Sequence, residues 1–178
     1  MNTWIALLRG INVGGHNILP MAKLRQDLES LNLTNVRTYI QSGNVVFDST
    51  ARTASTLASK ISRRIEQQYG FRPHLLILKG KDFLTAIESN PFPAAVTDPK
   101  TLHFFFLAEP ASGPDTRAMD DAKTSTERYK LTDSVLYLHA PDGIGRSRLA
   151  ANAEKLLGVV TTARNFRTVD RLASMVMD

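Results

Sequence analysis

The chain has 178 residues, carries a formal net charge of +5 and contains no cysteine. A chain of this length can bury roughly 70% of the surface that it exposes when unfolded, so its core needs neither a disulfide nor a metal ion. The absence of cysteine excludes disulfides, thiolate nucleophiles and thiolate metal sites. The first eight residues are mostly apolar, but Arg9 and the polar loop after it stop this run far short of a signal peptide or a membrane span. We therefore expect a cytoplasmic protein without a membrane segment.

The positive charge is unevenly distributed along the chain. Residues 1–80 contain ten basic and four acidic residues, a charge of +6, and residues 143–178 contain six and three, a charge of +3. Residues 81–142 contain six basic and ten acidic residues, a charge of −4. The two basic segments suit an anionic ligand or nucleic acid, although a solvated basic face without any partner is the alternative interpretation.

The first half of the chain predicts the element order β-α-β-β-α-β. Pro20 is well placed at the first turn of a helix, and Leu24, Leu28 and Leu31 give that helix an apolar stripe. Ser42 and Gly43 read as a two-residue hairpin turn. The expected strands cover residues 3–9, 36–40, 44–47 and 74–78, and a second helix covers 53–69.

The same order begins again after a proline-rich segment. Residues 90–100, NPFPAAVTDPK, contain three of the eight prolines and predict a linker. Strands are then expected at 103–108, 128–131, 135–139 and 159–163, with helices at 114–122, 147–157 and 165–175. We therefore predict an α+β protein of two ferredoxin-like subdomains, residues 1–89 and 101–178, with mostly antiparallel sheets and a closing C-terminal helix.

Two blocks of the sequence carry a family resemblance. They are LLRGINVGGHNILPMAKLRQDLESLNLTNVRTYIQSGNVVF at 7–47 and GIGRSRLAANAEKLLGVVTTARNFRTVDRL at 143–172. Both closely resemble the uncharacterised bacterial family known as domain of unknown function 1697. The resemblance implies two ferredoxin-like subdomains and no assigned function. Two positions depart from the usual family pattern, with Asn32 in place of Gly and Phe166 in place of Trp.

Strand parity predicts that each hairpin has one apolar and one polar face. With Ser42 and Gly43 as the turn, the first polar face pairs Gln41 with Asn44, Tyr39 with Val46 and Arg37 with Asp48. Its apolar face would contain Val36, Thr38, Ile40, Val45 and Phe47. In the second hairpin the corresponding basic and aromatic face contains Arg128, Lys130, Tyr137 and His139, opposite a face of Tyr129, Leu131, Leu136 and Leu138.

Such faces are typical of platforms that stack bases and bind phosphates, so nucleic-acid binding is one interpretation. Against it, no aromatic-rich RNA-recognition signature is present, and the strands TWIALL and HFFFLA are apolar on both faces. A strand of that kind is normally covered on both sides. The cover would be the other half of the chain, with the polar hairpin ends around a cleft, or a second copy in a homodimer.

The loop from Arg9 to Asn17 is the first candidate anion site. It contains three glycines and precedes a helix N-terminus, where backbone N–H groups and the helix dipole favour a bound anion. The loop lacks both the Walker pattern and the dinucleotide fingerprint, and a structural loop is the alternative. Its candidate ligand groups are Arg9, Asn12 and Asn17, joined by Gln41 and Asn44 of the hairpin.

Two further helix starts carry arginine side chains. Arg146 and Arg148 flank Ser147, an expected helix cap, while Arg164 and Arg167 flank Asn165, a good N-cap for the last helix. A cation at a helix N-terminus is disfavoured by roughly 0.3–1 kcal/mol, a cost that a bound oxyanion would reduce. Guanidinium groups match phosphates and carboxylates with two parallel hydrogen bonds. A solvated helix face with chance arginines is the alternative.

Residues that could react are scarce. Neither Ser42 nor Ser147 lies in a nucleophile elbow or a recognisable triad spacing, and no paired carboxylates occur in the family-like blocks. The four histidines are scattered, and His103 lies in an apolar strand where we expect a core residue with satisfied hydrogen bonds. We predict no catalytic residue, no metal site and no cofactor.

These patterns favour a protein that binds a small phosphate- or carboxylate-bearing ligand in a cleft between the two subdomains. The residues expected to bind it are Arg9, Asn12, Asn17, Gln41, Asn44, Arg146, Ser147, Arg148, Arg164 and Arg167. Nucleic-acid binding by the basic surface and an enzyme acting on a phosphorylated metabolite are the alternative functions. The sequence does not define an oligomeric state.

Overall fold

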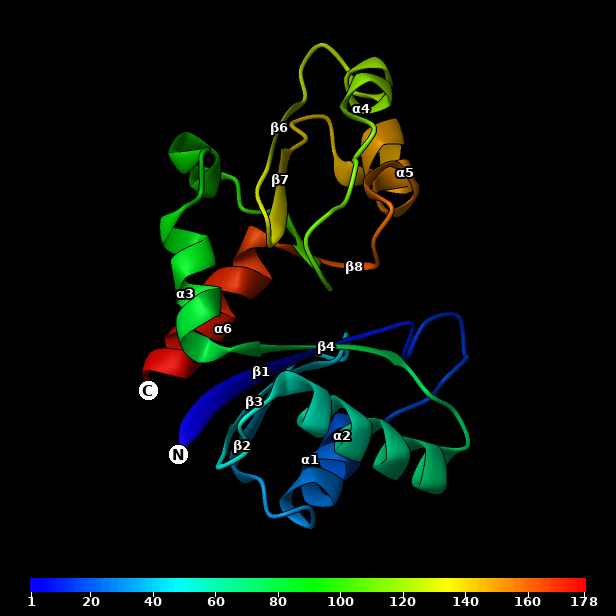
Figure 1. The fold of residues 1–178 in the computed structure, drawn as a ribbon, viewed down its shortest axis with the longest axis vertical. Coiled ribbons are helices and arrows are strands. Elements are labelled where there is room, and N and C mark those ends of the chain that lie inside the picture. Colours follow the sequence, from blue (N-terminus) through cyan, green and yellow to red (C-terminus); the bar gives the residue numbers. More distant parts are fainter. The chain divides into compact units, whose positions relative to one another are not determined.

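A computed structural model describes residues 1–178 and divides them into two compact units. Unit 1 contains Met1–Thr85 together with Leu172–Asp178, and unit 2 contains Ala86–Arg171. Each unit is built around one four-stranded antiparallel sheet (Figure 1).

The sheet of unit 1 has the strand order β2-β3-β1-β4. Its strands are β1 (Asn2–Arg9), β2 (Thr34–Tyr39), β3 (Asn44–Ser49) and β4 (His74–Lys79). Helices α1 (Met21–Glu29) and α2 (Ala54–Tyr69) lie on one face of this sheet (Figure 1), and α3 (Gly80–Glu88) follows β4 directly. The chain therefore runs β-α-β-β-α-β, as predicted.

The core of unit 1 comes from helix stripes that meet alternate residues of the central strands. Leu24 and Leu28 of α1 pack with a second stripe of α2 and with the strand residues Trp4, Ala6, Leu8, Val45 and Phe47. In α2 the stripe is Leu57, Ile61 and Ile65, at the spacing of one helix face. The Thr53 hydroxyl accepts the backbone N–H of Thr56 at 3.3 Å and so starts α2.

The sheet of unit 2 has the equivalent order β6-β7-β5-β8. Its strands are β5 (Leu102–Leu107), β6 (Arg128–Leu131), β7 (Val135–His139) and β8 (Thr161–Asn165). Helices α4 (Thr116–Ala122) and α5 (Arg148–Leu157) cover one face, and α6 (Phe166–Met177) follows β8 (Figure 1). Two short 3₁₀ helices, η1 (Pro93–Thr97) and η2 (Ile144–Arg146), complete the unit.

Every residue of β5 is buried, which matches the expectation that this strand is covered on both faces. On the helix side, Phe105 and Leu107 pack with Leu136, Leu138 and the stripe Leu149, Ala153 and Leu157. On the other side, the Phe104 and Tyr137 rings meet edge to face, with centroids 4.8 Å apart. The Tyr137 hydroxyl donates to the backbone carbonyl of Ala86 at 2.7 Å.

The predicted α+β fold with a C-terminal helix is confirmed, and two parts of the chain add detail. Helix α3 was not among the predicted elements. The proline-rich segment 90–100 lies within unit 2 and contains η1, because Pro93 has a fixed φ that suits the first turn of a helix. No helix of the structure is both long and apolar enough to cross a membrane.

The predicted register of the first hairpin is wrong by two residues. Tyr39, not Gln41, lies opposite Asn44, so the turn is a four-residue loop of residues 40–43. The Asn44 amide stabilises this loop by donating to the Tyr39 carbonyl at 3.1 Å and to the Ser42 hydroxyl at 2.9 Å. Because the slip is an even number of residues, the paired strand residues keep their predicted faces. Ile40, predicted on the apolar face, instead lies in the loop and is 50% exposed.

A register shift between Thr34 and Arg37 also changes the expected pairing of Arg37 with Asp48. Asp48 lies opposite Thr34, and its carboxylate accepts hydrogen bonds from Thr3 at 2.8 Å and from Asn35 at 3.3 Å. Arg37 lies opposite Val46, and its Nε is buried without a hydrogen-bond partner. The predicted Arg37–Asp48 pair is therefore absent.

Candidate functional site

The glycine-rich loop and the first hairpin turn meet at one end of unit 1. The backbone N–H of Leu8 donates to the Gly43 carbonyl at 2.8 Å. The Asn12 amide donates to the carbonyls of Leu19 at 3.0 Å and Gln41 at 2.9 Å, and its oxygen accepts the Leu19 N–H at 2.7 Å. The topology thus brings Arg9, Asn12, Asn17, Gln41 and Asn44 to the same end of the unit.

Three of these five predicted ligand residues already bind the backbone. Asn12 uses its whole amide as described, Asn17 donates to the Gly10 carbonyl at 2.8 Å, and Asn44 is fully buried within its loop. Asn12 and Asn17 also have positive φ angles of 54° and 51°, which Asn tolerates better than most residues. The side chains of these asparagines therefore stabilise the loop, while Gln41 takes part through its backbone carbonyl.

The arginine-bearing helix starts come together at one end of unit 2. Strands β7 and β8 flank β5 and run in the same direction, with His139 opposite Leu102 and Asn165 opposite His103. Both strands therefore end beside the start of β5. Helix α6 follows β8 at once, and α5 follows β7 after the residues 140–147. Arg146, Arg148, Arg164 and Arg167 consequently lie at the same end of the sheet.

Both predicted helix caps are confirmed. The Ser147 hydroxyl accepts the backbone N–H of Ala150 at 2.9 Å, and the Asn165 side-chain oxygen accepts that of Thr168 at 3.0 Å. Arg146, Arg148 and Arg167 are exposed, and none of them forms an ion pair. Three positive side chains therefore stand at helix N-termini, where the dipole disfavours cations.

Arg164 differs from these three because it is partly buried. It lies on β8 opposite Phe104, and its guanidinium donates to the Ala163 carbonyl at 2.8 Å. Burial lowers the pKa of Arg164 to about 10, so the group remains charged at neutral pH. A partly buried positive charge is thus held at the end of unit 2 that also carries the exposed arginines.

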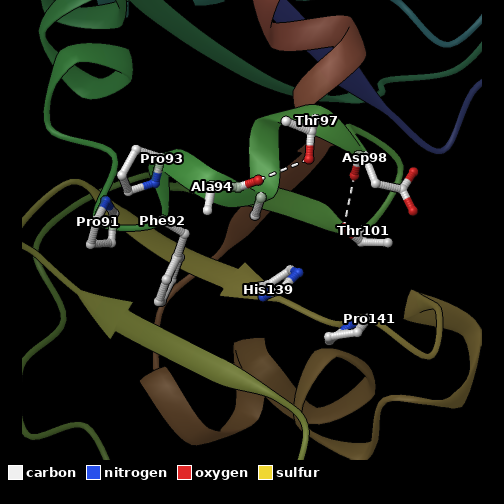
Figure 2. A pocket seen from close by; sticks show the side chains of 10 residues that line it. Pro91, Phe92, Pro93, Ala94, Thr97, Asp98, Thr101, His139 and Pro141 are labelled. Carbon is white, nitrogen blue, oxygen red and sulfur yellow. Dashed lines mark hydrogen bonds between the residues drawn. The ribbon is translucent and has the colours of Figure 1, made fainter.

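A pocket of about 510 Å³ lies at this end of unit 2. Its lining comes mostly from residues 91–101, with His139 and Pro141 from the end of β7. Figure 2 shows the Phe92 and His139 side chains beneath η1, with Pro91 and Pro93 to one side and Asp98 to the other. The Phe92 and His139 rings are 6.2 Å apart and tilted by 37°. Rigid rings therefore form much of the pocket wall.

The polar groups of the pocket are few. The hydroxyls of Thr97 and Thr101 donate to the backbone carbonyls of Ala94 at 3.0 Å and Asp98 at 2.8 Å, as the dashed lines in Figure 2 show. The Asp98 carboxylate is exposed and accepts no hydrogen bond or ion pair. His139 is half-buried, and its ring nitrogens have no hydrogen-bond partner.

The sequence did not reveal this pocket, because the proline-rich segment that forms most of the pocket wall was predicted to be a linker. A proline-rich segment lacks the apolar periodicity by which helices and strands are predicted. The available signals were Phe92 between two prolines and His139 at the polar end of a strand. Nothing in the sequence connects these two residues, since β5, α4 and β6 separate them along the chain.

The second hairpin does not expose the aromatic platform that base stacking needs. Tyr137 shares its face with Arg128, Lys130 and His139, as parity predicts, and lies beside Phe104 in the sheet. Both rings are at most 1% exposed. Their stacking faces contact protein atoms instead of solvent, which weakens the interpretation of this face as a nucleic-acid platform.

His103 is buried, as expected, but its hydrogen bonds are not all satisfied. It is 7% exposed, lies between Leu138 and Asn165 in the sheet, and its Nδ1 has no hydrogen-bond partner. Burial lowers the pKa of His103 below its usual value. Residues 1–178 contain no group of three or more His, Cys, Asp or Glu side chains that could hold a metal ion.

Comparisons with known proteins agree with this fold. The structure is similar to that of the conserved bacterial protein SP0830 from Streptococcus pneumoniae, with a TM-score of 0.74 and 26% sequence identity over 98% of both chains. A comparison with curated proteins gives no match. The model of the family described as Protein of unknown function (DUF1697) matches residues 1–137. This match covers most of the chain and confirms the predicted resemblance, so the protein belongs to the DUF1697 family.

Proposed function

We propose that the protein binds a small phosphate- or carboxylate-bearing ligand at the end of unit 2 where β7 and β8 lead into α5 and α6. The observation that carries this proposal is the set of exposed arginines without ion pairs, Arg146, Arg148 and Arg167, at two helix starts on one end of one sheet. Arg164 and Ser147 complete the proposed set.

Physical chemistry favours an oxyanion at this position. Each helix start presents backbone N–H groups and a partial positive charge, and guanidinium groups bind phosphate or carboxylate through paired hydrogen bonds. The bound anion would also reduce the repulsion between arginines and helix dipoles. A neutral ligand would have neither effect.

The loop before α5 is folded back tightly, which keeps Arg146 near the end of β7. The backbone N–H groups of Gly143 and Arg146 donate to the carbonyls of Ala140 at 3.0 Å and Gly143 at 3.2 Å. Two such turns place the Arg146 Cα within roughly 14 Å of the Ala140 Cα, since each turn spans less than about 7 Å. The arginine therefore stays at the end of the sheet that also carries Arg164.

The asparagine side chains of unit 1 are not included in the proposed site. Asn12, Asn17 and Asn44 already bind backbone groups, and a ligand would have to displace those hydrogen bonds. We also infer a cytoplasmic location, because a protein without cysteine draws no stability from an oxidising compartment.

Titration with pyrophosphate and citrate tests the proposal. The double variant Arg146→Ala/Arg148→Ala should bind at least about ten-fold more weakly than the wild type, because it loses two charged hydrogen-bonding groups. The matched control is Arg52→Ala/Arg117→Ala, which removes the same charge from exposed residues elsewhere. Equal loss in both variants would show attraction by net charge alone, and no binding by the wild type would refute the proposal.

A further inference from the structure

The pocket below η1 has a different chemistry from the arginine cluster. We propose that it is a second ligand site, which binds a small flat ring carrying a cationic or N–H-donating group such as an amidinium. The proposal concerns only the pocket lined by residues 91–95, 97, 98 and 101 together with His139 and Pro141, and it does not depend on anion binding at the helix starts.

The shape and the rings of the pocket suit a flat ligand. Its volume of about 510 Å³ falls within the range of small-molecule sites. The Phe92 and His139 rings and the pyrrolidine rings of Pro91, Pro93 and Pro141 supply rigid surface that loses little conformational entropy when a ligand binds. An aromatic ring can therefore pack against Phe92 at low entropic cost.

The threonine hydroxyls of the pocket accept hydrogen bonds from a ligand, and the His139 imidazole can both accept and donate. The protons of the Thr97 and Thr101 hydroxyls point to backbone carbonyls, which leaves oxygen lone pairs for a ligand. Pro91, Pro93 and Pro141 have no backbone N–H, and no Lys or Arg lines the pocket. His139 is the one side chain in the lining with a ring nitrogen.

Asp98 sets the charge that the pocket prefers. Its carboxylate lies at the pocket wall without a hydrogen bond or an ion pair and is the only ionisable side chain in the lining besides His139. A cation in the pocket would provide the carboxylate with a partner, whereas an anion would be repelled by it. Charge complementarity thus selects a ligand opposite in sign to the one proposed for the arginine cluster.

Three probes of equal shape separate these contributions in the full-length protein. Benzamidine is cationic, benzamide neutral and benzoate anionic, so their order of affinity reports the charge preference of the site. We expect benzamidine to bind roughly three- to ten-fold more tightly than benzamide, the range from an exposed to a partly buried ion pair, and benzoate to bind most weakly. The chemical shifts of the Phe92 and His139 rings should move during the benzamidine titration.

Asp98→Asn should remove the preference for benzamidine over benzamide and leave the fold intact, because only the Asp98 backbone forms hydrogen bonds. Asp133→Asn is the matched control, since Asp133 is exposed in the β6–β7 turn at the other end of the sheet. Phe92→Leu should weaken all three probes alike. Tightest binding of benzoate, a preference that survives Asp98→Asn, or no shift at Phe92 and His139 would each overturn the proposal.

Discussion

His103 shows how a single residue can make the stability of a unit depend on pH. It is buried on the helix side of the unit 2 sheet, beside the apolar residues Leu138 and Phe105, with one ring nitrogen unpaired. A charged imidazolium in this position would lose hydration without gaining a counter-ion, so the folded protein keeps His103 neutral and lowers its pKa.

Because folding lowers the pKa of His103, we predict that unit 2 becomes less stable as the pH falls. The unfolded chain binds a proton at His103 near pH 6.5, while the folded chain binds it only at lower pH. The stability that unit 2 gains by keeping His103 neutral is therefore fully present above about pH 6.5. This stability is lost as the pH falls toward the pKa of His103 in the folded protein. Urea unfolding of His103→Leu, measured between about pH 7.5 and about pH 5, should show a smaller decrease in stability than the wild type.

His16→Leu is the control, because His16 is exposed in the glycine-rich loop of unit 1. It should retain the wild-type dependence on pH. If His103→Leu loses as much stability between these pH values as the wild type does, the titrating group is not His103.

At the scale of elements, the first hairpin depends on a close approach to β1. Gly43 has φ +80°, and its carbonyl accepts the Leu8 backbone N–H at 2.8 Å. A Cβ atom on Gly43 would lie 2.6 Å from the Leu8 Cβ and 2.9 Å from the Ile11 Cδ1. Glycine is needed here for two reasons, the left-handed backbone and the lack of space.

Gly43→Ala should therefore destabilise unit 1 by roughly 2–5 kcal/mol, from left-handed strain together with overpacking against Leu8. Gly15→Ala provides the comparison, since Gly15 has φ +77° but a Cβ there would meet nothing within 4 Å. That variant should lose only about 1–2 kcal/mol. Fluorescence of Trp4, the single tryptophan and a core residue of unit 1, reports urea unfolding of both variants. Equal losses would show that space around Gly43 is not limiting.

The secondary-structure elements were the most predictable feature of this protein. Ser147 and Asn165 cap the helices that the sequence assigns to them, because a cap is a contact over three residues. The hairpin faces were also predictable, since parity survives an even slip in register. The register itself was not predictable, because the Asn44 amide favours a four-residue loop over the expected two-residue turn.

At the scale of the whole molecule, the chain returns to its first unit at its end. Leu172–Asp178, the last part of α6 and the residue after it, belongs to unit 1, where the Val176 side chain lies close enough to Gly80 to exclude a Cβ there. Leu172, Ala173 and Met175 are at most 6% exposed. Unit 1 therefore needs residues from both ends of the sequence to complete its packing.

Removal of Leu172–Asp178 should destabilise unit 1 by roughly 3 kcal/mol or more, because burial of one Leu and one Met contributes about 1.5–3 kcal/mol each. The Trp4 fluorescence transition should accordingly move to lower urea concentration. Removal of Met177 and Asp178 alone should leave it unchanged, since Met177 is 70% exposed. An unchanged transition in the longer deletion would show that unit 1 is complete without the end of α6.

The sequence by itself determined the helices, the strands, their repeated order and the membership of a family, because these depend on periodicity and capping over short stretches of chain. Only the tertiary structure decided which polar groups have partners. The Asn12 amide binds the Gln41 carbonyl 29 positions away, and the Phe92 ring meets the His139 ring 47 positions away, so neither contact follows from local pattern. A side chain's partner depends on long-range packing. That packing gives the loop asparagines of unit 1 backbone partners and leaves Arg146, Arg148 and Arg167 of unit 2 exposed without ion pairs.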